Sequence, residues 1–129
     1  MTRETQSVLV AVIEDDALQL TAMRMLLESW GYRTISAHTP GALAEAALAT
    51  PPDVIVSDFR LPGEMSGIDA VDALRQLTGR VIPAVLQTGD TAASLVEQAN
   101  ARGYTLLHKP YDPNRLKLVL DRLLTDIPS

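Results

Sequence analysis

The sequence predicts an α/β domain in which a doubly wound, five-stranded parallel sheet is built from five successive strand–helix units, (βα)5. Two observations support this fold class. Short apolar runs without polar alternation, typical of parallel strands covered on both faces, alternate with stretches whose apolar residues recur at helical spacing. The length of 129 residues suits a single domain, which we expect to span 1–129 with a core from about 8 to 124.

Four of the predicted strands are clearly aliphatic, and the second along the chain is weaker. They are Val8–Ile13, Arg33–Ala37, Val54–Ser57, Ile82–Gln87 and Tyr104–His108. Right-handed crossovers leave two common doubly wound arrangements, and five strands suit the order 2-1-3-4-5. In that order the ligand crevice lies beyond the carboxyl ends of the first and third strands.

Each predicted strand is followed by a helical pattern that opens on residues suited to a helix start. The expected starts are, in order, Asp16, Thr39–Pro40, Ser66–Asp69, Asp90 or Thr91, and Asp112–Pro113. Asp, Ser and Thr oxygens accept hydrogen bonds from N–H groups of the first turn, and Pro fits that turn because its missing N–H is not needed there. In the last helix Leu118 falls opposite the apolar stripe, so we expect it to be exposed.

Composition excludes several kinds of site and partner. The chain has no cysteine and only two histidines, which excludes disulfides, thiolate metal sites and a zinc site built on imidazoles. A net charge of −5 disfavours direct contact with nucleic acid. The first residues are polar, and no apolar run approaches the roughly 18 residues of a membrane span. We therefore expect a cytoplasmic protein without direct membrane contact.

Carboxylates gather where two neighbouring strands of the predicted sheet end. Glu14, Asp15 and Asp16 follow the first strand, and Asp58 ends the third. These charges repel one another, and a hard divalent cation with oxygen ligands relieves the repulsion, which favours Mg²⁺. A helix cap needs a single acid, so we assign Asp16 to the helix start and the other two acids to the metal.

Two further functional groups end strands at the same edge of the predicted sheet. Thr88 ends the fourth strand and Lys109 the fifth. An aspartate can act as a nucleophile toward phosphorus, and the transferred group then needs a hydroxyl, a cationic donor and Mg²⁺ for its oxygens. The pattern therefore predicts phosphoryl transfer to Asp58.

Four segments, VIEDDA, IVSDFRLPG, LQTGD and HKPY, resemble the signature segments of response-regulator receiver domains of two-component signalling. Each is weak alone, but four in the right order, each ending a strand, make the resemblance specific, and it covers about Val8 to Leu124. It implies the flavodoxin-like receiver fold, whose strand order is also 2-1-3-4-5, so that order is not an independent prediction.

The resemblance implies a role for each matching residue. Asp58 would be the phospho-acceptor, Thr88 the switch hydroxyl and Lys109 the lysine characteristic of the family. The bond between Lys109 and Pro110 would be cis. The metal, Mg²⁺ or in its place Mn²⁺, would be held by Asp15 directly, by Glu14 through water, by Asp58 and by the backbone carbonyl of Arg60. A histidine kinase or a histidine phosphotransfer protein would supply the phosphoryl group.

Three departures from the family pattern stand out. The position of the switch aromatic holds Leu106, while Tyr104 lies two residues earlier on the same side of the strand. The segment LPGEMSG is one residue longer than the usual loop, and we attribute its glycines to that detour. Arg60 and Asp90 occupy two positions that tune dephosphorylation, and we hypothesise that their opposite charges form a lid that lengthens the phosphorylated lifetime.

The sequence does not decide whether this domain is part of a longer protein or which output it controls. The stretch GYTLLHKPYDPNRL is more similar to receivers attached C-terminally to hybrid sensor kinases than to those of transcription factors, which implies a fragment or a free-standing relative. An output domain or a homodimer would use the face formed by the fourth helix, fifth strand and fifth helix.

The sequence also bears on three other functions. A phosphatase or phosphotransferase with an aspartyl nucleophile usually has a second acid where this chain has Arg60. A flavodoxin-like cofactor binder needs a phosphate-cradling loop where Glu14 and its neighbours would repel phosphate. A docking module that no longer needs phosphate is disfavoured by the complete pocket and slightly favoured by Leu106.

Overall fold

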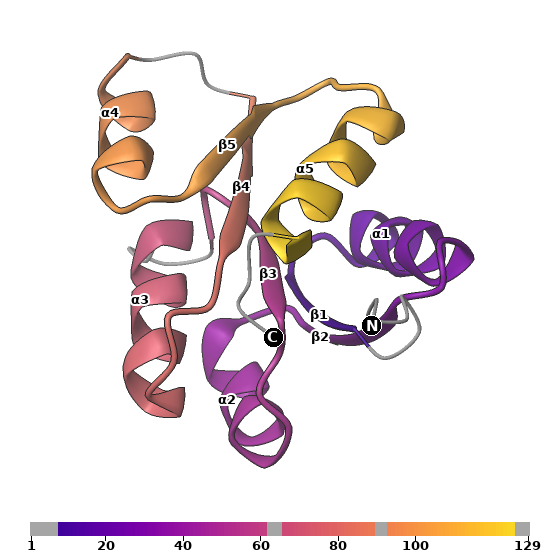
Figure 1. Ribbon diagram of the computed structural model, residues 1–129, viewed down its shortest axis with the longest axis vertical. Helices are drawn as coiled ribbons and strands as arrows, with labels where there is room; N and C mark the ends of the chain where they lie inside the picture. Colours follow the sequence, from indigo (N-terminus) through magenta and orange to yellow (C-terminus); the bar gives the residue numbers. More distant parts are fainter. Residues whose placement is uncertain (1–7, 62–65, 90–92, 126–129) are drawn as a thin grey trace.

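The structure, a computed structural model, describes residues 8–61, 66–89 and 93–125. Within these residues, strands and helices alternate regularly along the chain (Figure 1). The strands are β1 (Leu9–Ile13), β2 (Arg33–Ala37), β3 (Val54–Asp58), β4 (Ala84–Thr88) and β5 (Thr105–His108). The helices are α1 (Ala17–Ser29), α2 (Pro40–Ala49), α3 (Gly67–Thr78), α4 (Ala93–Ala101) and α5 (Pro113–Thr125).

The strands form one parallel sheet in the order β2-β1-β3-β4-β5, which confirms the predicted fold and strand order. Ile13 at the end of β1 pairs with Ser57, and Asp58 at the end of β3 pairs with Gln87. Thr88 at the end of β4 pairs with His108. The carboxyl ends of β1, β3, β4 and β5 therefore meet along one edge of the sheet.

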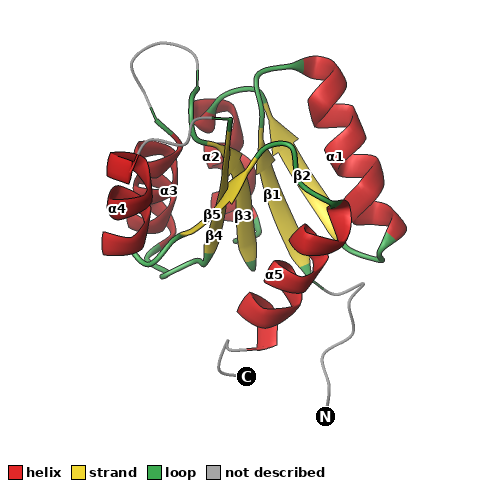
Figure 2. Ribbon diagram, turned by 90° about the horizontal axis from the view of Figure 1, so that it is seen from above, coloured by secondary structure: helices red, strands yellow, loops and turns green. Residues whose placement is uncertain are grey.

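Helices cover both faces of the sheet. In Figures 1 and 2, α2, α3 and α4 lie on one face, and α1 and α5 lie on the other. Strand side chains alternate between the two cores: Ile55 packs with α2, α3 and α4, while Val54 and Val56 pack with α1 and α5. Burial on both faces explains why β1, β3 and β4 are uniformly buried and why their sequences lack polar alternation.

Strand limits differ from the predicted ones by one or two residues. The fourth strand begins at Ala84 rather than Ile82, because Pro83 has no N–H to donate to the ladder, although its carbonyl accepts from the Ile55 N–H at 3.0 Å. β3 continues to Asp58, which therefore has a fixed backbone at the edge of the sheet. Tyr104 precedes β5 but is still buried.

The predicted helix caps in the described residues are confirmed. Asp16 accepts from the Gln19 N–H through Oδ1 at 3.0 Å, and Thr39 caps α2 with Pro40 in its first turn. Ser66 and Asp69 form the predicted capping box of α3. Asp90 and Thr91, the expected start of the fourth helix, lie outside the described residues.

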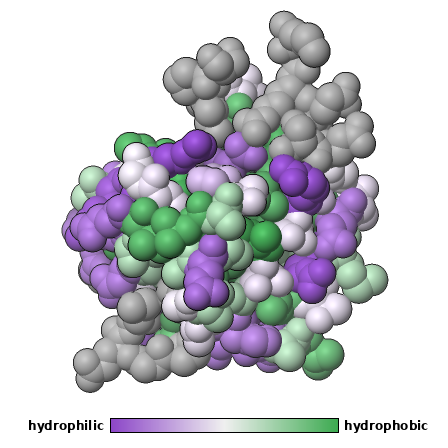
Figure 3. Space-filling view, turned by 90° about the horizontal axis from the view of Figure 1, so that it is seen from below, coloured by the Kyte–Doolittle hydropathy of each residue, from purple (hydrophilic) through white to green (hydrophobic). Residues whose placement is uncertain are grey.

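A few apolar side chains lie on the surface. Leu118 on α5 is 69% exposed, as its position opposite the apolar stripe predicts. Leu77 and Val81, where α3 leads toward β4, are also exposed. Seen from below (Figure 3), the molecule shows apolar side chains gathered among polar ones. None of the helices in the described part of the chain is long and apolar enough to cross a membrane.

Candidate functional site

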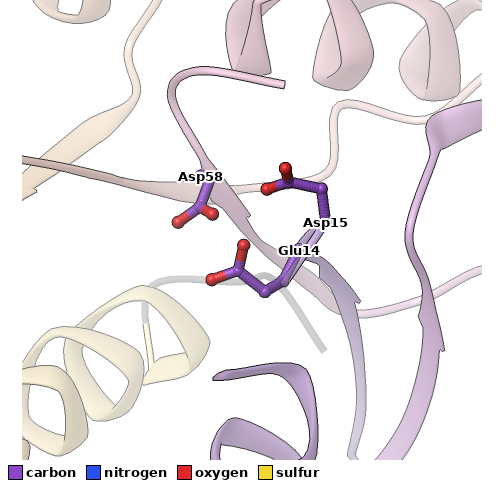
Figure 4. A group of neighbouring side chains, drawn as sticks. All are labelled: Glu14, Asp15 and Asp58. Atoms are coloured by element: carbon purple, nitrogen blue, oxygen red, sulfur yellow. The ribbon is translucent and has the colours of Figure 1, made fainter. Parts of the chain in front are cut away.

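Three carboxylates converge where β1 and β3 end (Figure 4). Glu14 and Asp15 follow β1, and Asp58 ends β3. One carboxylate oxygen from each residue lies within 4.8 Å of the other two. Glu14 and Asp58 are buried, whereas Asp15 is exposed. The parallel pairing of β1 with β3 is what brings these residues together, as the strand order predicts.

Burial strongly perturbs one of these carboxylates. It raises the pKa of Glu14 to about 8, helped by a hydrogen bond with Asp58 and by the charge of Asp58. The Asp16 N–H, which donates to Glu14 Oε2 at 3.3 Å, and the charge of Lys109 act in the opposite direction. The Glu14 carboxyl therefore keeps its proton to a higher pH than an ordinary glutamate when no cation is bound. Two buried acids beside an exposed one are a hard, all-oxygen donor set that fits Mg²⁺.

The ammonium of Lys109 is held among these acids. Its Nζ lies 2.9 Å from Asp58 Oδ1, 3.2 Å from Gln19 Oε1 and 3.9 Å from Glu14 Oε1. The backbone N–H of Lys109 donates to the Thr88 carbonyl at 2.7 Å, which anchors the lysine to the end of β4. The following Lys109–Pro110 bond is cis, as predicted.

A cavity of about 350 Å³ opens over Asp58. Its lining residues are Asp58, Arg60, Gln87, Thr88, Gly89 and Lys109. The acid, hydroxyl and ammonium expected at one edge of the sheet thus face the same space. Asp90 lies outside the described residues, so its pairing with Arg60 stays a prediction.

Gly67, at the start of α3, has a packing role that the sequence did not indicate. Residues 62–65 lie outside the described residues, and so does most of the longer loop. Gly67 is the first residue of α3, and a Cβ there would overlap the backbone carbonyl oxygen of Asp58. Its lack of a side chain therefore allows close packing of the helix on the strand, and the detour of the loop stays a prediction.

Tyr104 and Leu106 lie on the same face of the sheet, as strand alternation predicts. Leu106 is half-buried against the core under α3 and α4. The Tyr104 hydroxyl donates to Asp72, and the guanidinium of Arg75 lies 4.4 Å from the centre of its ring. Side chains of α3 therefore fix Tyr104 in place.

Three residues near the site escaped the sequence analysis: Gln19, Gln87 and Tyr111. Gln19 contacts the Lys109 ammonium from α1. The Tyr111 hydroxyl donates to Oε1 of Gln87, which is 5% exposed. A glutamine inside the apolar run AVLQT is a signal that could have pointed to a buried polar contact.

Known proteins share both the sequence pattern and the fold. The family model for the response regulator receiver domain matches residues 10–121. The transcriptional regulatory protein KdpE of Mycobacterium tuberculosis is 38% identical over 104 residues, which cover 80% of this chain and 45% of that protein. The transcriptional regulatory protein ZraR of Escherichia coli is 25% identical over 120 residues, or 93% of this chain and 27% of ZraR. The chain thus spans less than half the length of these curated relatives.

Two solved structures have closely similar folds. The chemotaxis protein CheY4 of Vibrio cholerae is 27% identical with a TM-score of 0.79, covering 91% of this chain and 98% of CheY4. The receiver domain of the sensor histidine kinase PA1611 of Pseudomonas aeruginosa, solved with a magnesium ion coordinated in its active site cleft, is 25% identical with a TM-score of 0.78, covering 92% of this chain and 98% of that domain. With a family match over residues 10–121, this chain belongs to the response-regulator receiver domain family.

Proposed function

We propose that this chain is a phosphorylation-dependent switch of a two-component system or phosphorelay, in which Asp58 accepts a phosphoryl group from a histidine kinase or a histidine phosphotransfer protein. The observation that supports this most is the placement of Lys109, whose ammonium lies 2.9 Å from Asp58 Oδ1 beside a cavity that Thr88 also lines. A nucleophilic oxygen, a hydroxyl and a cation thus border one space of about 350 Å³.

In the proposed reaction a carboxylate oxygen of Asp58 attacks the phosphorus of a phosphohistidine. The P–N bond breaks, its electron pair goes to the donor imidazole, and an acyl phosphate forms on Asp58. Lys109 neutralises one phosphoryl oxygen and the Thr88 hydroxyl donates to another. Water later hydrolyses the acyl phosphate, so the chain regulates itself by this chemistry and is not proposed as an enzyme for other substrates.

Mg²⁺ is the proposed cofactor, and Mn²⁺ is expected to replace it. The residues proposed to hold the ion are Glu14, Asp15 and Asp58, with the backbone carbonyl of Arg60 as a further ligand. A bound cation offsets the negative charge of the acids and of the incoming phosphoryl group. The magnesium ion in the Pseudomonas receiver domain supports this choice of metal.

Phosphorylation is proposed to draw Thr88 toward Asp58 and thereby shift the connection after β4. This would reshape the face formed by α4, β5 and α5, through which an output domain or a second copy of the chain would read the signal. A cytoplasmic location is part of this proposal, as is the Arg60–Asp90 lid. Unchanged acyl-phosphate half-lives in the variants Arg60→Ala and Asp90→Ala would disprove the lid.

Phosphate uptake tests the proposal directly. The protein is incubated with Mg²⁺ and acetyl phosphate, a small phosphodonor, and intact mass is followed over time. We expect a single phosphoryl group on the wild type and none on Asp58→Asn, which keeps the size of the side chain but cannot form the acyl phosphate. Uptake that persists in Asp58→Asn, or is missing from the wild type in the presence of Mg²⁺, would rule the proposed function out.

A docking module that no longer responds to phosphate is the second candidate, because Leu106 stands at the switch position and α3 fixes Tyr104. Partner binding measured with and without a beryllofluoride mimic of the phosphoryl group separates the two. Equal affinity in both states would favour the docking module, and a change that Asp58→Asn abolishes would favour the switch.

A further inference from the structure

Gln87 is a buried polar residue on the face of β4 that packs against the apolar core under α1 and α5. It shares one face of β4 with Val85, which is fully buried in the core under α1 and α5, and it is itself only 5% exposed. Burial of an amide lowers stability unless its polar atoms are hydrogen-bonded. The Tyr111 hydroxyl satisfies the amide oxygen by donating to Gln87 Oε1.

This hydrogen bond joins the end of β4 to the segment that carries Lys109. Tyr111 lies two residues after Lys109, in the connection between β5 and α5, and its ring packs against the core under α1 and α5. The Lys109 N–H donates to the Thr88 carbonyl at 2.7 Å. Lys109 is thus hydrogen-bonded to Thr88, and Tyr111 to Gln87, the residue before Thr88 in β4. These two hydrogen bonds set the position of the Lys109 backbone.

The side chain of Lys109 depends on this backbone position because it lies between two cavities. One is the cavity of about 350 Å³ over Asp58, and the other, of about 210 Å³, is lined by residues of α1 such as Gln19 and Met23. Gln87 and Lys109 line both. A flexible four-carbon stem with open space on both sides is poorly confined by packing. Its ammonium is therefore directed by the backbone anchor and by polar partners.

We propose that Gln87 and Tyr111 are positioning residues for Lys109: their hydrogen bond holds the β5–α5 connection where the ammonium reaches Asp58. Neither residue acts on the phosphoryl group itself. The effect of this hydrogen bond on phosphate uptake rests on the proposed function, whereas its effect on the position of Lys109 does not.

The first test removes only the hydroxyl, in Tyr111→Phe, and follows phosphate uptake from acetyl phosphate with Mg²⁺. We expect uptake to slow by about fivefold to tenfold, the effect of one lost hydrogen bond. Gln87→Met should slow uptake similarly, and the double variant should add nothing further. The matched control is Tyr32→Phe, which removes a buried tyrosine hydroxyl that donates to Asp121 Oδ1 at 3.4 Å, away from the site. It should leave uptake unchanged.

A second arm separates positioning from a loss of stability. If Tyr111 acts through Lys109, Tyr111→Phe should have no effect on uptake in a Lys109→Ala background, and a further loss there would overturn the proposal. Crystal structures of the wild type and Tyr111→Phe give a readout without phosphate: we expect Lys109 Nζ to leave Asp58 Oδ1 in the variant. An unmoved ammonium would overturn the positioning role, even if the wild type takes up no phosphate and the proposed function itself has failed.

Discussion

Gly67 packs directly against the backbone carbonyl of Asp58. The Gly67 N–H donates to the Phe59 carbonyl at 2.6 Å, which draws the start of α3 onto the end of β3. A Cβ on Gly67 would overlap the Asp58 carbonyl oxygen and would lie 3.0 Å from Cδ2 of Leu86. The proposed phospho-acceptor and the first turn of α3 therefore fit together only because residue 67 has no side chain.

We expect Gly67→Ala to lower the free energy of unfolding by about 1–3 kcal/mol, because the added methyl group forces α3 away from β3. The affinity for Mg²⁺ should fall with it, since the backbone of Asp58 must shift. Gly41→Ala is the matched control: it lies in α2 with nothing within 4 Å of an added Cβ, and it should be neutral or stabilising by up to about 1 kcal/mol. Urea denaturation measures both, and equal effects would contradict the packing argument.

The raised pKa of Glu14 predicts how stability depends on pH without a metal. Its pKa in the folded chain is about 8 against an ordinary 4.5, mainly because the side chain is buried. The folded chain then binds the proton more tightly than the unfolded chain. The contribution of this proton to the free energy of unfolding is fully present below about pH 4.5 and is lost as pH rises through 8. As pH rises over this range, we expect loss of the Glu14 contribution to lower the thermal midpoint of the metal-free chain. The affinity for Mg²⁺ should rise over the same range, because the ionised carboxylate is the form that binds the metal.

Glu14→Gln provides the control for the pH experiment. It keeps the size and hydrogen-bonding capacity of the side chain but cannot lose a proton, so the slope between pH 5 and 8 should flatten. If the wild type and Glu14→Gln had the same pH profile, another group would be responsible for the dependence.

The tyrosines make a second pH prediction. The chain has three, and burial is the largest cause that raises each pKa from 10.0 to about 12. The nearby carboxylates of Asp121, Asp72 and Asp58 raise the pKa values of Tyr32, Tyr104 and Tyr111 further. Absorbance of the folded protein at alkaline pH should therefore show little phenolate near pH 10, whereas the denatured chain should titrate there.

The raised pKa values of the tyrosines also predict how the free energy of unfolding depends on pH. The neutral phenol is favoured in the folded chain, so this stability is present below pH 10 and is lost as pH rises through 12. Cooperative unfolding should accompany ionisation. A phenolate signal that develops fully near pH 10 while the fold persists would show that the hydroxyls are solvated.

Local rules were sufficient to predict much of the fold from the sequence. Asp16, Thr39 and Ser66 cap helices because a side-chain oxygen meets an N–H only two or three residues away, and such contacts can be read from spacing. The uninterrupted apolar runs indicate a parallel sheet, while the strand order was chosen between two common arrangements and is also the order that the family resemblance implies. Once strands β1, β3, β4 and β5 are parallel, their last residues must meet at one edge, which places Glu14 and Asp58 together.

Contacts between distant side chains were not predictable in this way. Gln19 reaches Lys109 across 90 residues of sequence, and Tyr111 reaches Gln87 across 24. Their meeting depends on the rotation of α1 and on the path of the β5–α5 connection, which no local pattern specifies. The reason for Gly67 was missed likewise, because the close approach of its helix to Asp58 exists only after the two elements pack.

Tyr104 provides the last prediction, because its contacts bear on how the switch would work. Its hydroxyl donates to Asp72, which also pairs with Arg102, while Arg75 lies over its ring. We expect Tyr104→Phe to lower the free energy of unfolding by about 1 kcal/mol, the usual value of one such hydrogen bond. In a double-mutant cycle with Asp72→Asn the two losses should not add.

The same contacts predict that Tyr104 does not move on phosphorylation. With Leu106 at the position of the switch aromatic and Tyr104 tied to α3, a rotating ring cannot transmit the signal along this face of β5. Fluorotyrosine labels at the three tyrosines can be followed by ¹⁹F NMR as beryllofluoride and Mg²⁺ are added. We expect the resonance of Tyr111 to shift, because its hydroxyl contacts β4 next to Thr88, while that of Tyr104 stays in place. A large shift at Tyr104 with none at Tyr111 would mean that the signal crosses the sheet on the side of α3 and α4.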